Sequence, residues 1–331
     1  MPRGPRIDCP GLLHHVIIRG IEKKDIYESD EDRKDFVDRI EKVLKKSDAK
    51  IYAWTLMPNH AHLLIKTGNK PLSYIMRRIL TGYAISYNRR HKRVGYLYQG
   101  RYKSIVCEEE AYLLELVRYI HLNPLRAGIV ETIEALDKFK WTGHYKLIGN
   151  KKVEWQDKKE ILTRFGKKKN LAIKRYKEFI IEGMNQGKRE DLSGGGLIRS
   201  LGGIGNAMLV EGKNKQMFDQ RILGGGGFVE DILKNAEKKE EIESKMDIDE
   251  LISRVGKYYD IEPYKIINGK NQRGLGNIKA VLVNLGKERL GISGKSIAQK
   301  LNLSKSWISK LNSLGAEILE DEERVLNKVL R

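Results

Sequence analysis

Two histidines in the first quarter of the chain have the clearest capacity for chemistry. His60 and His62 stand two residues apart in residues 56–65, whose apolar residues predict a β-strand. Side chains alternate along a strand, so both imidazoles lie on one face of the sheet. Two neutral imidazoles on a rigid support can bind a divalent metal ion. The alternative is two strand histidines that face a polar cleft for unrelated reasons.

A predicted helix offers a second pair of reactive side chains. It begins near residues 108–110 and stops at Pro124, which cannot easily continue a helix. Tyr119 and Asn123 are four residues apart and therefore share one helical face. The alternative is a packing tyrosine followed by an asparagine that caps the helix. Glu115 lies one turn before Tyr119, as either a base or a surface carboxylate.

Regular elements must hold these side chains in place, and the first part of the chain alternates strands with helices. Apolar periodicity predicts strands over residues 14–20, 51–57 and 62–66, and helices that begin near residues 29, 71 and 108. This order predicts a compact α+β domain with one small sheet and helices packed on it.

A basic segment with interleaved tyrosines connects the second and third predicted helices. Backbone charge and base stacking both contribute to single-stranded DNA binding, so cations among aromatic residues favour that ligand. The candidate DNA contacts are Arg89, Arg90, Arg101 and Lys103. The alternative is a basic loop whose tyrosines enter the core.

The composition changes after about residue 150. Residues 151–189 are strongly charged and predicted to be helical, and glycine clusters follow at residues 194–196, 202–203 and 224–227. The clusters match neither the P-loop nor the dinucleotide fingerprint, so a linker is favoured over a phosphate cradle.

The end of the chain has the spacing of a helix-turn-helix. Residues 294–301 and 304–311 predict two short helices around a turn, and an ordinary helical hairpin is the alternative. Lys295, Lys305 and Lys310 are candidate DNA contacts there. We therefore expect three domains: a catalytic domain over residues 1–148, a connecting region over residues 149–245 and a DNA-binding domain over residues 246–331.

The bulk composition favours a polyanionic partner. The 331 residues include 63 Lys and Arg against 44 Asp and Glu, a formal net charge of +19. Nucleic acid is the simplest such partner, and a generically basic soluble protein is the alternative. The two cysteines, Cys9 and Cys107, argue against a disulfide framework and suit a reducing cytoplasm. There is no apolar run of transmembrane length and no signal-peptide core, so we expect a cytoplasmic protein without a membrane partner.

Several motifs together resemble the single-tyrosine HUH transposases, and most closely the branch of REP-associated tyrosine transposases. The resemblance covers roughly the first 145 residues and rests mainly on residues 57–62 and 119–128, with support from residues 15–20, 87–90 and 100–104. The helix-turn-helix pattern is similar to the DnaA-type DNA-binding module.

The resemblance implies a ferredoxin-like (RRM-like) domain with an antiparallel sheet, followed by a mostly helical region. It implies a metal-dependent enzyme that nicks single-stranded DNA and transfers the strand, at hairpins of palindromic repeats. By the same resemblance His60, His62 and Asn123 would bind Mg²⁺ or Mn²⁺. Tyr119 would be the nucleophile and would form a 5′-phosphotyrosine with a free 3′-OH. A homodimer and duplex binding through the C-terminal domain are further expectations.

Two other functions are compatible with parts of this pattern. A catalytically silent DNA-binding regulator could use the same fold, although the motif residues are all present. A two-histidine phosphodiesterase would need a second His-x-Thr or His-x-Ser motif, which the sequence lacks. The DNA sequence recognised, the physiological metal, self-mobility and the choice between cis and trans action of Tyr119 stay undecided by the sequence.

Overall fold

The chain forms two compact units, Met1–Leu233 and Lys234–Arg331. The computed structural model describes residues 7–149, 154–186, 192, 219, 221–269, 274–321 and 329. The first unit is an α+β structure and the second is helical, as the sequence predicts. The first glycine clusters, at residues 194–196 and 202–203, lie outside the described residues.

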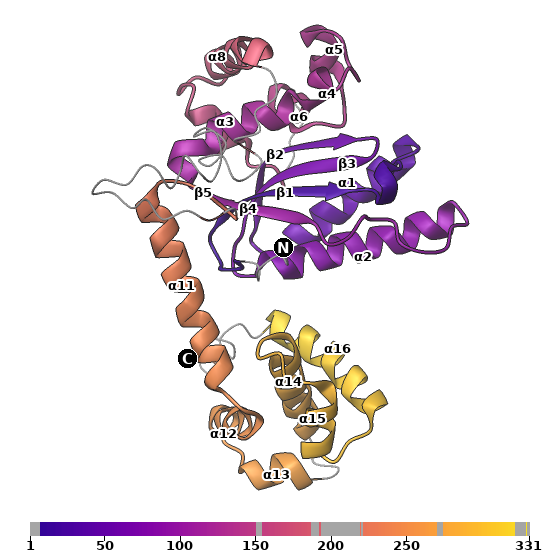
Figure 1. Cartoon of the computed structure of the whole chain (residues 1–331), viewed down its shortest axis with the longest axis vertical. Helices are drawn as coiled ribbons and strands as arrows, with labels where there is room; N and C mark the ends of the chain where they lie inside the picture. Colours follow the sequence, from indigo (N-terminus) through magenta and orange to yellow (C-terminus); the bar gives the residue numbers. More distant parts are fainter. Residues whose placement is uncertain are drawn as a thin grey trace, which may run out of the picture. The chain divides into compact units, whose positions relative to one another are not determined.

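A mixed sheet of five strands, with the order β2-β3-β1-β4-β5, forms the centre of the first unit (Figure 1). The strands are β1 (Leu13–Arg19), β2 (Lys50–Met57), β3 (His60–Lys66), β4 (Lys103–Cys107) and β5 (Ile222–Leu223). The first four pair antiparallel, and with the helices between them they have the strand order of a ferredoxin-like fold. The expected antiparallel sheet is therefore confirmed for four strands, whereas β5 pairs parallel with β4 and makes the sheet mixed.

Two long helices, α1 (Asp30–Leu44) and α2 (Leu72–Arg90), cover one face of the sheet. A capping box between Ser29 and Asp32 satisfies the first amides of α1 and fixes where that helix begins. Phe36, Ile79 and Trp54 are fully buried in the core between these helices and the sheet.

Six shorter helices cover the opposite face, above the sheet in Figure 1. They are α3 (Glu109–His121), α4 (Asn123–Arg126), α5 (Ile133–Lys138), α6 (Gly143–Ile148), α7 (Lys158–Thr163) and α8 (Lys169–Glu182). Ile161 of α7 and Tyr176 of α8 belong to the same buried core as Leu116 and Ile120 of α3. Helices beyond residue 148 are thus packed into the first unit, and the three-domain division stays a prediction.

The third glycine cluster connects β5 with α11 (Gly226–Lys245). The amide of Gly225 donates to Glu108 Oε2 at 2.8 Å, so a carboxylate occupies a position that a phosphate cradle would leave for its ligand. The boundary between the two units falls within α11.

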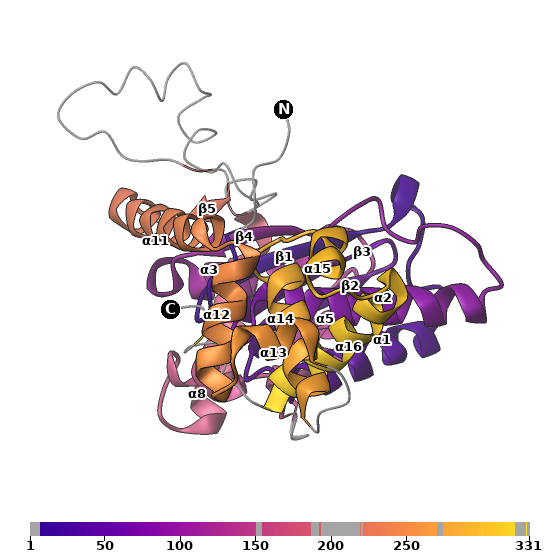
Figure 2. The same ribbon diagram turned by 90° about the horizontal axis from the view of Figure 1, so that it is seen from below.

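The second unit packs its helices around α14 (Leu275–Glu288), whose middle is almost wholly buried. Beside it lie α12 (Ile248–Tyr259), α13 (Pro263–Asn268), α15 (Gly294–Lys300) and α16 (Lys305–Asp321). α14 and α16 run side by side in both ribbon views (Figures 1 and 2). Residues 301–304 join α15 to α16, and Asn302 takes the left-handed conformation there with φ 55°. None of the described helices is long and apolar enough to cross a membrane.

Candidate active site on the sheet

Neighbouring side chains on β3 bring two imidazole rings together. In the antiparallel register His62 lies opposite Ile17 and His60 lies opposite Arg19, all on the sheet face that α3 covers. The ring centroids of His60 and His62 are 5.3 Å apart, and the rings meet edge to face. His62 is buried and His60 is half-buried, so the pair lies at the margin of the core.

A third histidine, His15 on β1, completes the cluster. Its ring stacks on that of His62 with centroids 5.2 Å apart, and its Nε2 lies 2.9 Å from His62 Nδ1. Its Nδ1 lies 3.2 Å from the carbonyl oxygen of Leu192. Sequence reasoning did not assign His15 a role. The alternation of side chains along β1 predicts on which face of the sheet His15 lies. Only the pairing of β1 with β3 shows that it lies beside His62.

Tyr119 on α3 is the tyrosine that faces this histidine cluster. Its ring centroid lies 6.0 Å from that of His62 and 5.9 Å from that of His15. Leu116 and Ile120 are buried in the core and set the rotation of α3, and half-buried Tyr119 packs at the edge of the same core, toward the histidines. The guanidinium of Arg126 lies 5.5 Å from the centre of the Tyr119 ring.

Asn123 is the first residue of α4, directly after the turn that ends α3. Its Nδ2 donates to the carbonyl oxygen of Tyr119 at 3.1 Å, which leaves Oδ1 as the atom able to bind a metal. Glu115 does not join this group as a base, because its carboxylate accepts from Arg118 at 2.6 Å.

Burial keeps the imidazoles neutral. It lowers the pKa of His15 to about 4, and with a smaller effect of Arg19 it lowers the pKa of His60 to about 4. Burial and the neighbouring His15 also hold the pKa of His62 well below its usual value. A neutral imidazole is the form that binds metal ions, so the site needs no deprotonation at neutral pH.

The candidate metal ligands are all neutral side chains. Among the residues that the structure describes, no group of three His, Cys, Asp or Glu side chains could hold a metal. The candidate set is instead two imidazole nitrogens of His60 and His62 and the amide oxygen of Asn123. Three neutral ligands leave the full charge of the ion available to an anionic substrate.

Cations border the histidine cluster on both sides. Arg19 at the end of β1 is exposed opposite His60, and it is a candidate phosphate contact that sequence reasoning missed. Lys103 at the start of β4 is exposed opposite Ile17, and its charge lowers the pKa of His15 after the larger effect of burial. Both cations therefore lie where a phosphate near the histidines would meet them.

The remaining basic residues predicted to contact DNA have different surroundings. Arg89 and Arg101 are exposed. Arg90 is instead held by intramolecular ion pairs with Asp32 and with Asp35.

The tyrosines of the basic segment divide in the same way. Tyr96 is 85% exposed, whereas Tyr102 is buried in the core on the α1 and α2 face and Tyr98 packs against it. The alternative of a basic loop whose tyrosines enter the core thus applies to Tyr98 and Tyr102, whereas exposed Tyr96 is able to stack on a base.

The predicted contacts of the second unit are all on its surface. Lys295 on α15 and both Lys305 and Lys310 on α16 are exposed. Trp307 is 54% exposed between the last two, and the ammonium of Lys310 lies 5.4 Å from its ring centre. An exposed tryptophan in the first turn of α16 is a further candidate contact that the charge pattern alone did not indicate.

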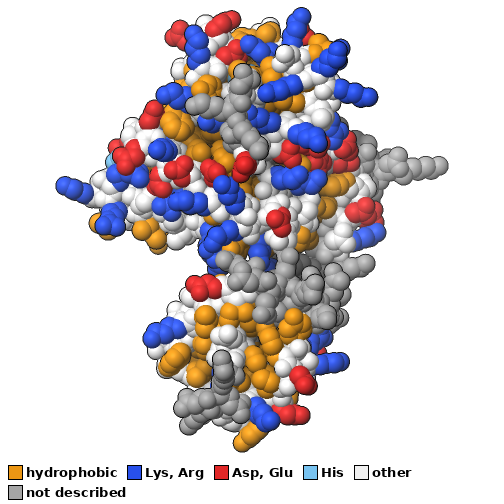
Figure 3. Space-filling view, turned by 180° about the vertical axis from the view of Figure 1, so that it is seen from behind, with side chains coloured by type: hydrophobic (Ala, Val, Ile, Leu, Met, Phe, Trp, Pro, Cys, Tyr) orange, Lys and Arg blue, Asp and Glu red, His pale blue; other side chains and the backbone are white. Residues whose placement is uncertain are grey.

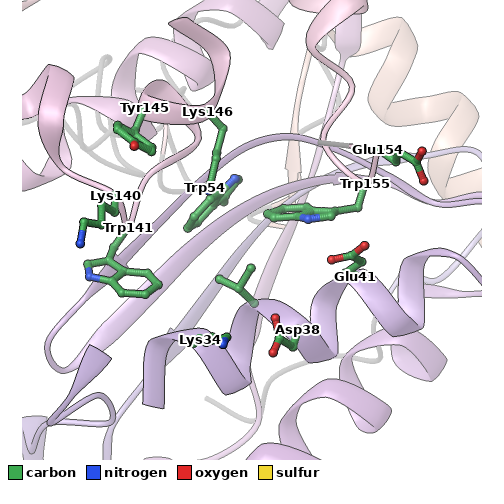
Figure 4. A pocket seen from close by; sticks show the side chains of 11 residues that line it. Lys34, Asp38, Glu41, Trp54, Lys140, Trp141, Tyr145, Lys146, Glu154 and Trp155 are labelled. Carbon is green, nitrogen blue, oxygen red and sulfur yellow. The ribbon is translucent and has the colours of Figure 1, made fainter. Parts of the chain in front are cut away.

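A separate pocket of about 640 Å³ lies at the β2 edge of the sheet, between α1 and α6 (Figure 4). Trp54, Trp141 and Trp155 line it together with α1 residues such as Lys34 and Asp38. Its lysines are matched by carboxylates. The pocket therefore has no net charge that would favour an anion. Figure 3 shows Lys and Arg mixed with Asp and Glu on one face of the first unit, beside patches of hydrophobic side chains.

Two comparisons with known proteins gave matches in this chain. The family described as "Transposase IS200 like" matches residues 9–123, which include the histidines, Tyr119 and Asn123. A solved structure described as "Structure of the REP associates tyrosine transposase bound to a REP hairpin" aligns with 15% identity and a TM-score of 0.38. The alignment covers 47% of this chain and 98% of that chain. No curated protein sequence matches the chain.

Proposed function

We propose that this chain, whose residues 9–123 match the family of IS200-like transposases, nicks and rejoins single-stranded DNA through a covalent bond to Tyr119. The observation that carries the proposal is the position of the Tyr119 ring, 6.0 Å from the ring of His62. A nucleophile beside two neutral metal ligands is an arrangement that can transfer a phosphodiester.

The metal site would act on the charge of the substrate. A phosphodiester is anionic and repels a nucleophile, and Mg²⁺ or Mn²⁺ held by His60, His62 and Asn123 would offset that charge when bound. Arg19 and Lys103 would bind neighbouring phosphate oxygens and orient the strand. Arg126 would stabilise negative charge on the phenolate, because its guanidinium lies over the Tyr119 ring.

The proposed reaction conserves the energy of the bond that it breaks. Tyr119 Oη loses its proton and forms a bond to the scissile phosphorus, while the bond to the 3′-oxygen breaks and that oxygen gains a proton. The products are a 5′-phosphotyrosine and a free 3′-OH. Attack by a 3′-OH on the phosphotyrosine reverses the step, so rejoining or strand transfer needs no ATP.

The substrate that we propose is a DNA hairpin with single-stranded flanks. The resemblance to REP-associated tyrosine transposases directs the proposal to hairpins of palindromic repeats. Exposed Arg89, Arg101 and Tyr96 would contact the strand beyond the scissile phosphate by charge and stacking. Duplex binding through α15 and α16 and a homodimer complete the proposal.

Replacement of the proposed nucleophile gives the direct test. We expect Tyr119→Phe to abolish the covalent adduct with a 3′-labelled hairpin oligonucleotide, measured on a denaturing gel in Mg²⁺ or Mn²⁺. DNA affinity should stay within about twofold of the wild-type value, because the ring and its packing are kept.

Tyr112→Phe is the matched control, since Tyr112 lies on the same helix and packs against the same core. It should form the adduct at the wild-type level. Adducts that persist in Tyr119→Phe would assign the reaction to another tyrosine. Binding without any adduct in the wild-type protein would instead support the catalytically silent regulator.

A further inference from the structure

Each of the three proposed metal ligands belongs to a hydrogen-bond chain that ends on a main-chain carbonyl oxygen. A carbonyl oxygen can only accept, so the direction of every bond in these chains is determined. We infer that Asn59 and His15 are positioning residues that fix His60 and His62 as Nδ1–H tautomers, so that both present a bare Nε2 to one divalent cation. This inference rests on the proposed function, which supplies the cation.

The first chain runs from Lys23 through Asn59 to His60. Asn59 Nδ2 donates to the carbonyl oxygen of Lys23 at 3.0 Å, which determines which end of the amide is oxygen. Asn59 Oδ1 therefore accepts, and it lies 2.6 Å from His60 Nδ1. That nitrogen must carry the hydrogen, so the lone pair of the neutral ring is on Nε2.

The backbone that supplies the first carbonyl oxygen is strained. Glu22 and Lys23 have φ of 52° and 61°, a conformation that residues other than glycine rarely adopt. Two consecutive left-handed residues without glycine are energetically unfavourable. The surrounding fold must therefore stabilise the turn that brings the Lys23 carbonyl group to Asn59.

The second chain runs from Leu192 through His15 to His62. His15 Nδ1 lies 3.2 Å from the carbonyl oxygen of Leu192 and must donate to it. A neutral His15 then has a bare Nε2, which accepts from His62 Nδ1 at 2.9 Å. His62 therefore also has its lone pair on Nε2, and the stacked rings hold that orientation.

The third chain is a single bond with the same outcome. Asn123 Nδ2 donates to the carbonyl oxygen of Tyr119, which directs Oδ1 away from that carbonyl group. Three ligand atoms of three residues are thus set in advance by the backbone. Side chains that are already oriented lose less entropy when they bind the metal. Hydrogen-bond partners of metal-binding side chains typically contribute 10–100-fold to metal affinity.

The His62 chain extends beyond the residues that match the transposase family. That match ends at residue 123, whereas the acceptor for His15 is the carbonyl group of Leu192, a buried residue of the same unit. A residue outside the family match, Leu192, therefore supplies the carbonyl oxygen that orients His15, and through His15 it orients the proposed ligand His62.

The tautomers can be observed directly in the metal-free protein. Long-range ¹H–¹⁵N correlation spectra of histidine-labelled protein at pH 7.5 distinguish a protonated Nδ1 from a protonated Nε2 in each ring. We expect His15, His60 and His62 all to be Nδ1–H, although free neutral histidine prefers Nε2–H. An Nε2–H signal from any of the three rings would overturn the inference.

Metal affinity separates positioning from packing. Binding of Mn²⁺ without DNA, followed by electron paramagnetic resonance, should weaken 10–100-fold in His15→Phe, which keeps a ring but removes the acceptor. His15→Gln should bind Mn²⁺ within about threefold of the wild type, because its Oε1 can accept from His62. Equal losses in both variants would contradict the inference.

The same test applies to His60, whose hydrogen-bond partner is Asn59. Asn59→Leu should weaken Mn²⁺ binding by a similar factor, whereas Asn59→Asp keeps an acceptor oxygen and should bind at least as tightly as the wild type. Wild-type affinity in Asn59→Leu would overturn the inference for His60. A wild-type protein with the predicted tautomers and no Mn²⁺ binding would contradict the proposed function instead.

Discussion

At the scale of single residues, strand alternation gives the adjacent histidines His14 and His15 on β1 different surroundings. His15 faces α3 and uses both ring nitrogens, whereas His14 faces the other side of the strand. Neither nitrogen of His14 has a hydrogen-bond partner among the described residues, and the side chain is fully buried. Two unsatisfied polar atoms in a core cost stability.

This contrast predicts the effect of replacing His14 by an apolar side chain. Burial lowers the pKa of His14 to about 4, below the value of 6.5 in the unfolded chain. As the pH falls from 6.5 toward 4 the unfolded chain takes up this proton first, so the folded state loses about 2 kcal/mol by pH 5. His14→Leu should remove that loss and should add about 1–3 kcal/mol at pH 7.5. Urea unfolding at both pH values, followed by the fluorescence of buried Trp54, measures both effects; an unchanged difference between the two pH values would contradict the prediction.

The candidate site shows how far sequence reasoning reaches at this scale. Period-two alternation placed His60 and His62 on one face, and helical spacing placed Tyr119 near Asn123. The roles of these residues came from resemblance and stay proposals. His15 and Arg19 join the site only through strand pairing, which local periodicity does not encode.

At the scale of elements, the predicted strands and helices of the first unit are present because their apolar periodicity is strong. β4 and β5 were not predicted, since five and two residues give little or no periodic signal. The packing of α8 was also not predicted, because its partners are distant in sequence: Tyr176 and Ile180 lie in the same apolar core as α3. Tyr176 of α8 bonds through its hydroxyl group to His121 Nδ1 of α3 and to His144 Nδ1 of α6.

A close approach between α14 and α16 gives a prediction for the second unit. A Cβ atom on Gly315 of α16 would lie 2.0 Å from the carbonyl oxygen of Ala280 on α14, so the helices would have to separate. We expect Gly315→Ala to lower the stability of this unit by about 1–3 kcal/mol. Gly276→Ala is the control, because a Cβ there meets no atom within 4 Å and should be neutral or stabilising. Differential scanning calorimetry shows whether one transition moves; an unshifted transition in Gly315→Ala would contradict the close contact.

At the scale of the whole molecule, the two units carry different parts of the proposed function. Every residue of the candidate active site lies in Met1–Leu233, whereas the lysines of the predicted helix-turn-helix lie in Lys234–Arg331. Composition predicted a change of character along the chain but not where the compact units divide. The division depends on which helices share a core, and α7 and α8 share theirs with the sheet.

This separation predicts that duplex affinity and strand cleavage can be removed independently. In the full chain, Lys305→Ala and Lys310→Ala should each reduce the slope of log K against log salt for duplex DNA by about 0.9, because each removes one released counterion. Neither change should alter the yield of the Tyr119 adduct on a single-stranded hairpin.

Lys257→Ala is the control, because it removes an exposed charge from α12 of the same unit and should leave the duplex slope unchanged. Fluorescence anisotropy at four salt concentrations measures the slopes. An equal effect of Lys257→Ala would reduce the α15–α16 proposal to net charge, and a parallel loss of adduct would show that the two units act as one site.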